Sequence, residues 1–253
     1  MIYISIEGLY DIYHTDLIKK EKMSELLDTS RCTECAFRSL LFDKLEFDEL
    51  VKMDGSKSEI KYAKGEDILV EGDKITEFVY LKKGLVKLSK KTENKRDHII
   101  SFAKPKTFIG FLTVFSHDTY QYTLSALEES TLCFINIDII KNIIKENGTF
   151  ALDVLAKISH VSDEIINRRV NICSKQLRGR IAYLLISFSK DIYYNTKFEL
   201  PLTRKEFGEL IDMSTENVIR ILSEFRKDGL IHIDGSKIEI LNFESLDKIS
   251  RFG

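Results

Sequence analysis

Residues 202–230, LTRKEFGELIDMSTENVIRILSEFRKDGL, have the pattern of two short amphipathic helices joined by a tight turn. Thr203 can accept a hydrogen bond from the backbone N–H three residues on, and Glu206 can reach back, which is a capping box. Gly208 allows a second helix to approach the first one closely. Ser214 is a good N-cap for that second helix. Its apolar residues recur at helical spacing and are predicted to be buried: Val218, Ile221, Leu222 and Phe225.

The opposite face of the second helix is polar and suits contact with double-stranded DNA. In a helix-turn-helix, the second helix enters the major groove with its N-terminal residues at the base edges. An ordinary helical hairpin with a solvated polar face is the alternative. The predicted DNA-binding residues are Thr203, Arg204, Ser214, Thr215, Glu216, Asn217, Ile219, Arg220, Ser223 and Lys227.

A short β-hairpin is predicted directly after these helices. In LIHIDGSKIEIL, isoleucines alternate with polar residues on both sides of Asp234-Gly235, which is a strong hairpin signal. A helix-turn-helix followed by a hairpin is a winged helix. We expect the wing to lie along the phosphate backbone.

The stretch LPLTRKEFGELIDMSTENVIRILSEFRKDGLI resembles the C-terminal signature of the Crp/Fnr family of bacterial transcription regulators, and NVIRILSEF resembles members common in the Bacteroidota. The resemblance implies that Glu216 and Arg220 read a DNA half-site. The chemistry agrees, because a carboxylate accepts from cytosine N4 and a guanidinium grips guanine O6 and N7. Each contact is worth about 1–3 kcal/mol of discrimination.

Two residues depart from the family pattern. Asp212 occupies the turn position where the family usually has glycine, and a side chain tolerates the left-handed conformation less well. Ile219 stands just before the arginine, where a small or hydroxyl residue is usual. We expect Ile219 to meet a thymine methyl, so that the preferred half-site differs from the usual TTGA-like sequence. The alternative is that it packs against the wing.

The composition is that of a globular protein with two domains. No run approaches the roughly 20 apolar residues of a membrane span, and the N-terminus lacks the features of a signal peptide. We therefore expect a cytoplasmic protein with no membrane partner. Residues 168–253 carry 15 Lys/Arg against 12 Asp/Glu, a net charge of +3, whereas residues 1–167 carry −5. The more basic C-terminal part suits contact with phosphates.

From about Ser58 to Asp138 the pattern changes to short alternating strands punctuated by glycine turns, which indicates a β-barrel or jelly roll. KGEDILVEGD and YLKKGLVKL resemble cyclic-nucleotide-binding domains. The predicted fold class is α+β: a jelly-roll domain, a long dimerisation helix and a winged helix-turn-helix. We expect an unassigned extension at 1–31 and domains at 32–148 (sensory β-roll), 149–174 (dimerisation helix) and 175–253 (DNA-binding domain).

The resemblance does not extend to the phosphate-binding segment of the cyclic-nucleotide domains. Phe111 stands where family members that bind the nucleotide have a glutamate, and Tyr120-Gln121 replace their Arg-Ser pair. An anionic phosphate needs such a guanidinium. We therefore predict no cyclic-nucleotide site. The aromatic residues of this region are expected to fill the core: Phe102, Phe108, Phe111, Phe115, Tyr120 and Tyr122. A small apolar ligand, or haem bound through His98 or His117, is the alternative.

Three cysteines match part of the iron–sulfur ligand set of Fnr-type members. The resemblance implies Cys32 and Cys35 as N-terminal metal ligands and Cys133 as the central one, but Leu41 stands where a third N-terminal cysteine is expected. The cofactor therefore stays unknown. A reactive thiol pair and purely structural cysteines are the alternatives. Cys173 is expected to be a small core residue.

A long helix is predicted before the C-terminal domain, with apolar residues every three to four positions: Leu152, Leu155, Ile158, Val161, Ile165 and Ile172. Such a seam favours a homodimer, and two recognition helices about 34–36 Å apart read a palindrome. Arg178 and Arg180 are candidates for phosphate contacts or an interdomain ion pair. RNA polymerase is expected as a further partner, and no catalytic motif is present. The alternative function is an effector-binding module that acts on a protein partner instead of DNA.

Overall fold

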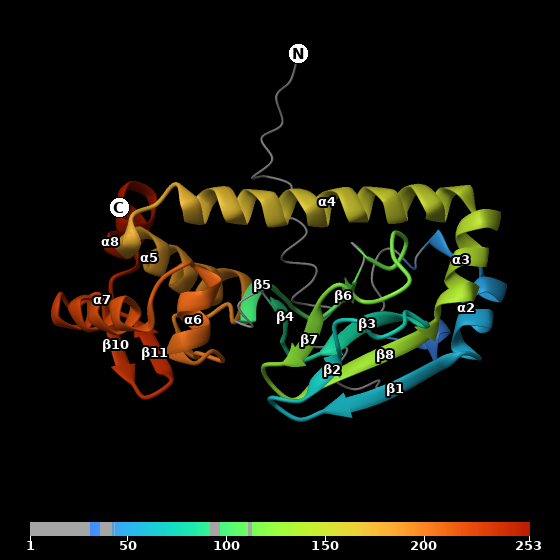
Figure 1. Ribbon diagram of the computed structural model, residues 1–253, viewed down its shortest axis with the longest axis horizontal. Coiled ribbons are helices and arrows are strands. Elements are labelled where there is room, and N and C mark those ends of the chain that lie inside the picture. The colour runs from blue at the N-terminus through green and yellow to red at the C-terminus, as the bar shows by residue number, and fades with distance from the viewer. Residues whose placement is uncertain (1–30, 36–41, 43, 92–96, 111–112) are drawn as a thin grey trace, which may run out of the picture.

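The computed structural model describes residues 31–35, 42, 44–91, 97–110 and 113–253 of the chain. The predicted N-terminal extension, apart from its last residue, lies outside these residues. The described chain forms a β-roll and a mainly helical C-terminal domain, and one long helix runs along both (Figure 1). Among the described helices, none is long and apolar enough to cross a membrane.

Two antiparallel sheets face each other in the roll, with strand orders β1-β8-β3-β6 and β2-β7-β4-β5. This arrangement confirms the predicted jelly-roll domain. The strands are β1 (Lys57–Tyr62), β2 (Asp67–Leu69), β3 (Glu77–Lys83), β4 (Val86–Lys91), β5 (Asp97–Ala103), β6 (Thr107–Ile109), β7 (Thr123–Ala126) and β8 (Ser130–Asn136).

Successive residues of β3 belong to two different cores, because side chains alternate between the faces of a strand. Val79 and Leu81 pack in the core between the two sheets. Phe78 and Tyr80 point the other way and pack in a second cluster, beneath the helices at that end of the roll. Those helices are η1 (Cys32–Glu34), α2 (Phe47–Asp54), α3 (Ile137–Glu146) and the start of α4 (Gly148–Cys173).

The aromatic residues do not fill the space between the sheets as expected. Phe108 and Tyr120 are buried, but in the cluster beneath the helices. Phe102 stacks on Phe188 of the C-terminal domain at 5.3 Å, and Phe115 is exposed. Phe111 lies outside the described residues. The core between the sheets is instead built from smaller aliphatic residues and Phe134.

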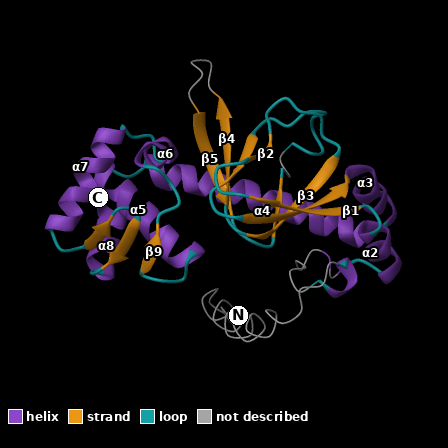
Figure 2. Ribbon diagram, turned by 90° about the horizontal axis from the view of Figure 1, so that it is seen from below, coloured by secondary structure: helices purple, strands orange, loops and turns teal. Residues whose placement is uncertain are grey.

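The C-terminal domain has the predicted winged helix-turn-helix order (Figure 2). Ile231 pairs with Ile240 and Ile233 with Ile238 across the wing, and β9 completes a three-stranded sheet in the order β10-β11-β9. The elements are α5 (Leu177–Ser187), η3 (Phe188–Ile192), β9 (Lys197–Glu199), α6 (Arg204–Leu210), α7 (Thr215–Lys227), β10 (Ile231–Asp234), β11 (Lys237–Ile240) and α8 (Phe243–Phe252).

Gly208 sits where α6 meets the turn that leads to α7. A β-carbon at this position would lie 2.5 Å from the carbonyl oxygen of Met213, far inside van der Waals contact, and 3.6 Å from Val218. The expected close approach is confirmed. The crowding atom belongs to the backbone, so a larger residue here displaces the turn itself.

We predict that Gly208→Ala destabilises the protein by about 1–3 kcal/mol through overpacking, measured as the free energy of urea unfolding. Gly148→Ala at the start of α4 is the matched control. A β-carbon there meets nothing within 4 Å. The control is expected to be neutral or to stabilise by up to about 1 kcal/mol. Equal effects at the two positions would contradict the packing argument.

Candidate nucleic-acid interface

The two helices of the motif begin at the predicted caps. The hydroxyl of Thr203 accepts from the backbone N–H of Glu206 at 3.2 Å, and the Glu206 carboxylate accepts from the Thr203 N–H at 2.8 Å. Ser214 Oγ accepts from the N–H of Asn217 at 3.3 Å. Asp212, in the turn between the helices, has φ 53° and lies in the left-handed region of backbone conformation. Family members usually have glycine at this sequence position. Local sequence signals therefore define both helix starts.

The exposed face of α7 presents the two residues predicted to read DNA. The four apolar residues of the helix are buried as expected, which turns the polar face to solvent. Glu216 is fully exposed in the first turn of α7. Hydrogen bonds from its own backbone N–H and from the Ser214 hydroxyl lower the pKa of the Glu216 carboxyl. It is therefore an ionised acceptor, which is the state needed to accept from a base amino group.

Arg220 is held in place by a network of side chains. Its Nη1 donates to Glu224 Oε1 at 2.5 Å, and its Nη2 lies 3.4 Å from Asn217 Oδ1. The other oxygen of Glu224 accepts from Arg178 Nη1 at 2.6 Å, and Arg178 Nη2 donates to Asp228 at 2.8 Å. Arg178 was expected to contact phosphate or to form an interdomain pair. It forms pairs within its own domain instead, and so supports the carboxylate that orients Arg220.

Arg204 supports the wing in this structure. Its Nη2 donates to the carbonyl oxygen of Gly235 at 2.9 Å, at the tip of the hairpin. The guanidinium is half-buried, and this burial lowers the pKa of Arg204. The sequence pattern did not indicate this role, because the contact joins residues that are far apart along the chain.

Ile219 lies on the exposed face of α7, with 52% of its surface accessible. It does not belong to the core of the domain, so the alternative of close packing against the wing has no support among the described residues. Most other predicted contact residues are also exposed or half-buried: Thr203, Ser214, Thr215, Asn217, Ser223 and Lys227.

The turn of the motif is tied to the rest of the molecule by basic residues. Arg169 of α4 forms an ion pair with Asp212. Arg180 donates to the carbonyl oxygens of Ile211 at 3.1 Å and of Asp212 at 3.4 Å. Lys87 on β4 of the roll pairs with the capping residue Glu206. The DNA-binding motif is therefore linked both to the long helix and to the roll, through contacts that sequence spacing could not reveal.

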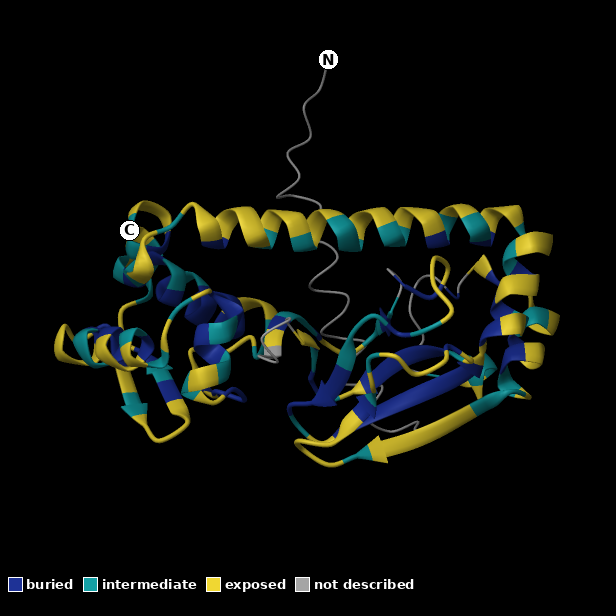
Figure 3. Cartoon of the chain, viewed as in Figure 1, coloured by how far each residue is buried: buried dark blue, intermediate teal, exposed yellow. Residues whose placement is uncertain are grey.

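The long helix α4 has a largely covered side and an exposed side (Figure 3), and both sides carry apolar residues. Val154 and Ile172 are buried against the chain's own domains, and Ile158, Val161 and Ile165 are half-buried on the same side. A second set points away from the molecule and is exposed: Leu152, Leu155, Ile166 and Val170. The seam predicted from the sequence combines residues of both faces. Only Leu152 and Leu155 of the predicted set lie on the outward face, because a period of three to four residues does not distinguish opposite stripes of a helix.

The three cysteines expected as metal ligands lie at the same end of the roll. Burial raises the pKa of Cys32 to about 12 and that of Cys133 to about 11, and nearby thiols add to both shifts. Cys133 Sγ lies 3.9 Å from a carboxylate oxygen of Glu59. Among the described residues, no group of three or more His, Cys, Asp or Glu side chains is arranged to hold a metal ion. Cys173 is exposed at the end of α4, so the expectation of a core residue is wrong.

In the segment that matches the family's phosphate-binding region, Tyr120 and Gln121 donate to backbone carbonyl groups of this chain. The Tyr120 hydroxyl donates to the carbonyl of Glu77 at 3.1 Å, and the Gln121 amide donates to that of Thr119 at 3.1 Å. Burial raises the pKa of Tyr120 to about 12, so the phenol is neutral. Of the two histidines considered as haem ligands, His117 is exposed and hydrogen-bonded to Ser116 at 2.8 Å, and His98 is exposed on β5.

Comparisons with known proteins agree with both domains. Residues 59–147 match the cyclic nucleotide-binding domain family, and residues 179–249 match the Crp-like helix-turn-helix domain family. The fumarate and nitrate reduction regulatory protein of Vibrio cholerae is 22% identical over 227 residues, covering 87% of this chain and 90% of that protein. The transcriptional activator protein anr of Pseudomonas aeruginosa is also 22% identical over 227 residues, covering 85% and 91%. The structure of FixK2 from Bradyrhizobium japonicum shares the fold, with a TM-score of 0.69 and 19% identity over 76% of this chain and 96% of that one.

A sensory-type β-roll, a long connecting helix and a winged helix-turn-helix with an exposed recognition helix define a class of DNA-binding transcription regulators. This chain belongs to the Crp/Fnr family of that class.

We predict that the buried thiol of Cys133 reacts slowly with alkylating agents. At pH 8 in iodoacetamide, Cys133 should be modified at least about tenfold more slowly in the folded protein than in concentrated urea, because burial raises its pKa to about 11 and few of these thiols are ionised. Mass spectrometry of digested protein at timed intervals measures both rates. Equal rates in the folded and the unfolded protein would contradict this expectation.

Proposed function

We propose that this regulator binds a palindromic DNA site as a homodimer, with α7 of each subunit in the major groove. The observation that carries the proposal is the state of the α7 face, where Glu216 is exposed and ionised and Arg220 is oriented by Glu224. Both groups are held by the protein before DNA arrives, so little side-chain freedom is lost on binding.

The individual roles follow from the chemistry of the groups. We assign Glu216 to a cytosine amino group and Arg220 to guanine O6 and N7. Ile219 lies beside them on the exposed face and suits a thymine methyl. The remaining polar residues of the face would contact bases or phosphates: Thr215, Asn217, Ser223 and Lys227. Thr203 and Ser214 lie near the helix starts, where backbone N–H groups favour phosphate oxygens. Arg204 would act by positioning the wing.

The outward face of α4 supplies the dimer contact in this proposal. Leu152 and Ile166 are two heptads apart, and Cys173 follows Ile166 by one more heptad. Leu152 is 67% exposed and Ile166 and Val170 are each 59% exposed in the single chain. A stripe of large apolar side chains on a long helix indicates a protein contact surface. A second copy of the same stripe forms a symmetric seam.

The domains proposed from the sequence fit this scheme. Residues 32–148 form the sensory roll, 149–174 the dimerisation helix and 175–253 the DNA-binding domain. The protein is proposed to act in the cytoplasm. RNA polymerase is proposed as a partner, since relatives such as anr are named transcriptional activators. Among the described residues we find no feature that favours a catalytic role.

We predict that replacing both Glu216 and Arg220 with alanine abolishes specific DNA binding. Each lost base contact is worth about 1–3 kcal/mol, so the affinity for the palindrome that the natural protein prefers should fall by at least about a hundredfold towards that for a scrambled duplex. Fluorescence anisotropy with labelled duplexes at fixed salt concentration measures both affinities. Lys248→Ala on the exposed face of α8 is the control and should bind normally.

Unchanged DNA binding by the folded double variant would favour the alternative, in which the C-terminal domain contacts a protein partner. The unfolding midpoint of the variant serves as the check on folding. Both residues are exposed or partly exposed on α7, so the midpoint is expected to stay close to that of the natural protein.

We predict that Ile166→Glu converts the dimer to a monomer. Two like charges would face each other in an apolar seam, and the side chain is exposed in the single chain, so the subunit fold is preserved. Sedimentation velocity should show dimer dissociation at concentrations at least about tenfold higher than for the natural protein. Asn167→Glu adds the same charge beside the seam and should leave the dimer intact. A monomeric natural protein, or a dimeric Ile166→Glu variant, would overturn the proposed seam.

A further inference from the structure

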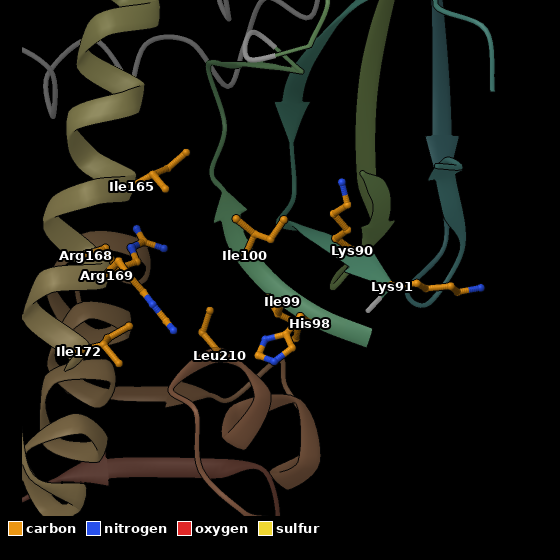
Figure 4. Close-up of a pocket in the computed structure, with 10 residues that line it drawn as sticks. All are labelled: Lys90, Lys91, His98, Ile99, Ile100, Ile165, Arg168, Arg169, Ile172 and Leu210. Carbon is orange, nitrogen blue, oxygen red and sulfur yellow. The ribbon is translucent and has the colours of Figure 1, made fainter. Parts of the chain in front are cut away.

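A cavity of about 590 Å³ lies where the long helix, the roll and the DNA-binding motif meet. Figure 4 shows its lining from three elements: α4, the β4–β5 pair and the end of α6. Its apolar wall consists of Ile99, Ile100, Ile165, Ile172 and Leu210. None of the ten described residues that line it carries a carboxylate, and none belongs to the segment that corresponds to the family's phosphate-binding region. A cavity of this size is typical of sites for small organic molecules.

Arg168 is a half-buried cation on the α4 side of this cavity. Its guanidinium stacks on the Phe102 ring, 4.3 Å from the ring centroid, and extends towards the open space (Figure 4). The Nη1 atom is buried and has no hydrogen-bond partner among the residues the structure describes. Burial lowers the pKa of Arg168, although the charges of Tyr183, Glu164 and Asp191 act in the opposite direction. A buried guanidinium nitrogen without an acceptor is unfavourable, so an anion entering the cavity would gain a strong hydrogen bond.

Arg169 stands beside it and faces the same space (Figure 4). Its partner in this structure is Asp212, the left-handed residue in the turn of the helix-turn-helix. The Arg169 side chain is 56% exposed, so its ion pair is open to competition from another anion. His98 lies on the opposite wall and adds a polar ring to the rim.

We propose that this cavity binds an amphiphilic anion: a small molecule with a carboxylate or phosphate head and an apolar body. The head pairs with Arg168 and Arg169, whose planar forks fit either anion. The body lies against the isoleucines and Leu210. A purely polar anion leaves the apolar wall uncovered, and a neutral apolar ligand leaves the Arg168 nitrogen without an acceptor.

Binding at this site changes the contact between α4 and the DNA-binding motif. An anionic head on Arg169 competes with Asp212 and frees the turn that begins the recognition helix. Leu210 at the end of α6 contributes to the same wall, so the ligand body also contacts the motif directly. This coupling rests on the proposed function, whereas the binding of the ligand itself does not.

Octanoate, octyl phosphate and 1-octanol test the site by calorimetric titration of the full-length protein. We expect one octanoate or octyl phosphate per chain, and at least tenfold weaker binding of 1-octanol, which lacks the charge. The relative affinities of the two anions identify the preferred head. Arg168→Met should weaken binding of the preferred anion at least tenfold. Arg251→Met, which removes an exposed arginine from α8, is the matched control and should bind that anion normally.

A second variant tests the apolar wall. Ile100→Trp fills the cavity from a half-buried position on β5 and should also weaken binding at least tenfold. The chain has no other tryptophan, so the emission of this residue reports whether the variant is folded. The site is overturned if neither anion binds, if 1-octanol binds as tightly as octanoate, or if Arg168→Met binds the preferred anion as the natural protein does.

DNA affinity measured with and without the preferred anion tests the coupling. We expect at least a fivefold change in the natural protein and no change in Arg169→Met. An equal response in Arg169→Met would overturn the competition with Asp212. Absence of DNA binding both with and without the anion, together with normal anion binding, would refute the proposed function but leave the site intact.

Discussion

The structure depends on the one-sided burial of α4. One face of this helix packs against the roll and the DNA-binding domain, through Val154 near its start and Ile172 near its end. The helix therefore runs along both domains (Figure 1). Its outward face keeps Leu152, Ile166 and Val170 exposed. The outer apolar face of such a helix is stabilised when a second surface covers it and removes it from water. The packing that buries the inner face of α4 therefore also favours a symmetric dimer through the outer face.

Polar contacts also join the helix-turn-helix motif to α4 and to the roll. Arg169 reaches from α4 to the turn at Asp212, and Lys87 reaches from the roll to the cap of α6. The Arg169–Asp212 pair is partly exposed, and exposed pairs contribute typically below about 1 kcal/mol each. The Lys87 and Glu206 side chains are only 21% and 20% exposed. Apolar contacts cross the same junction, because Ile99 and Leu127 of the roll belong to the core cluster of the DNA-binding domain. A ligand shifts the arrangement of such a junction only by its difference in affinity for the two arrangements. The cavity beside Arg168 and Arg169 lies at this junction.

Sequence reasoning predicted those parts of the fold that local patterns encode. The caps at Thr203 and Ser214, the wing turn at Gly235 and the alternating strands of the roll each depend on residues close together in the chain. The roles of residues whose contacts lie far along the chain were not predicted. Arg178 supports Glu224, and Arg204 holds the wing, across separations of 31 residues or more along the chain. Periodicity also placed both faces of α4 in one seam, because it records spacing but not the direction in which a side chain points.

Selection of bound duplexes from a random DNA pool by the purified protein, followed by sequencing, tests the central claim most directly. The account predicts enrichment of an inverted repeat, with half-site centres about one helical turn (10–10.5 base pairs) apart. Each half-site should include a C·G pair, read by Glu216 and Arg220, next to a thymine beneath Ile219. Enrichment of a single asymmetric motif would contradict the dimer on α4. Absence of any enriched sequence would contradict the reading of DNA by α7.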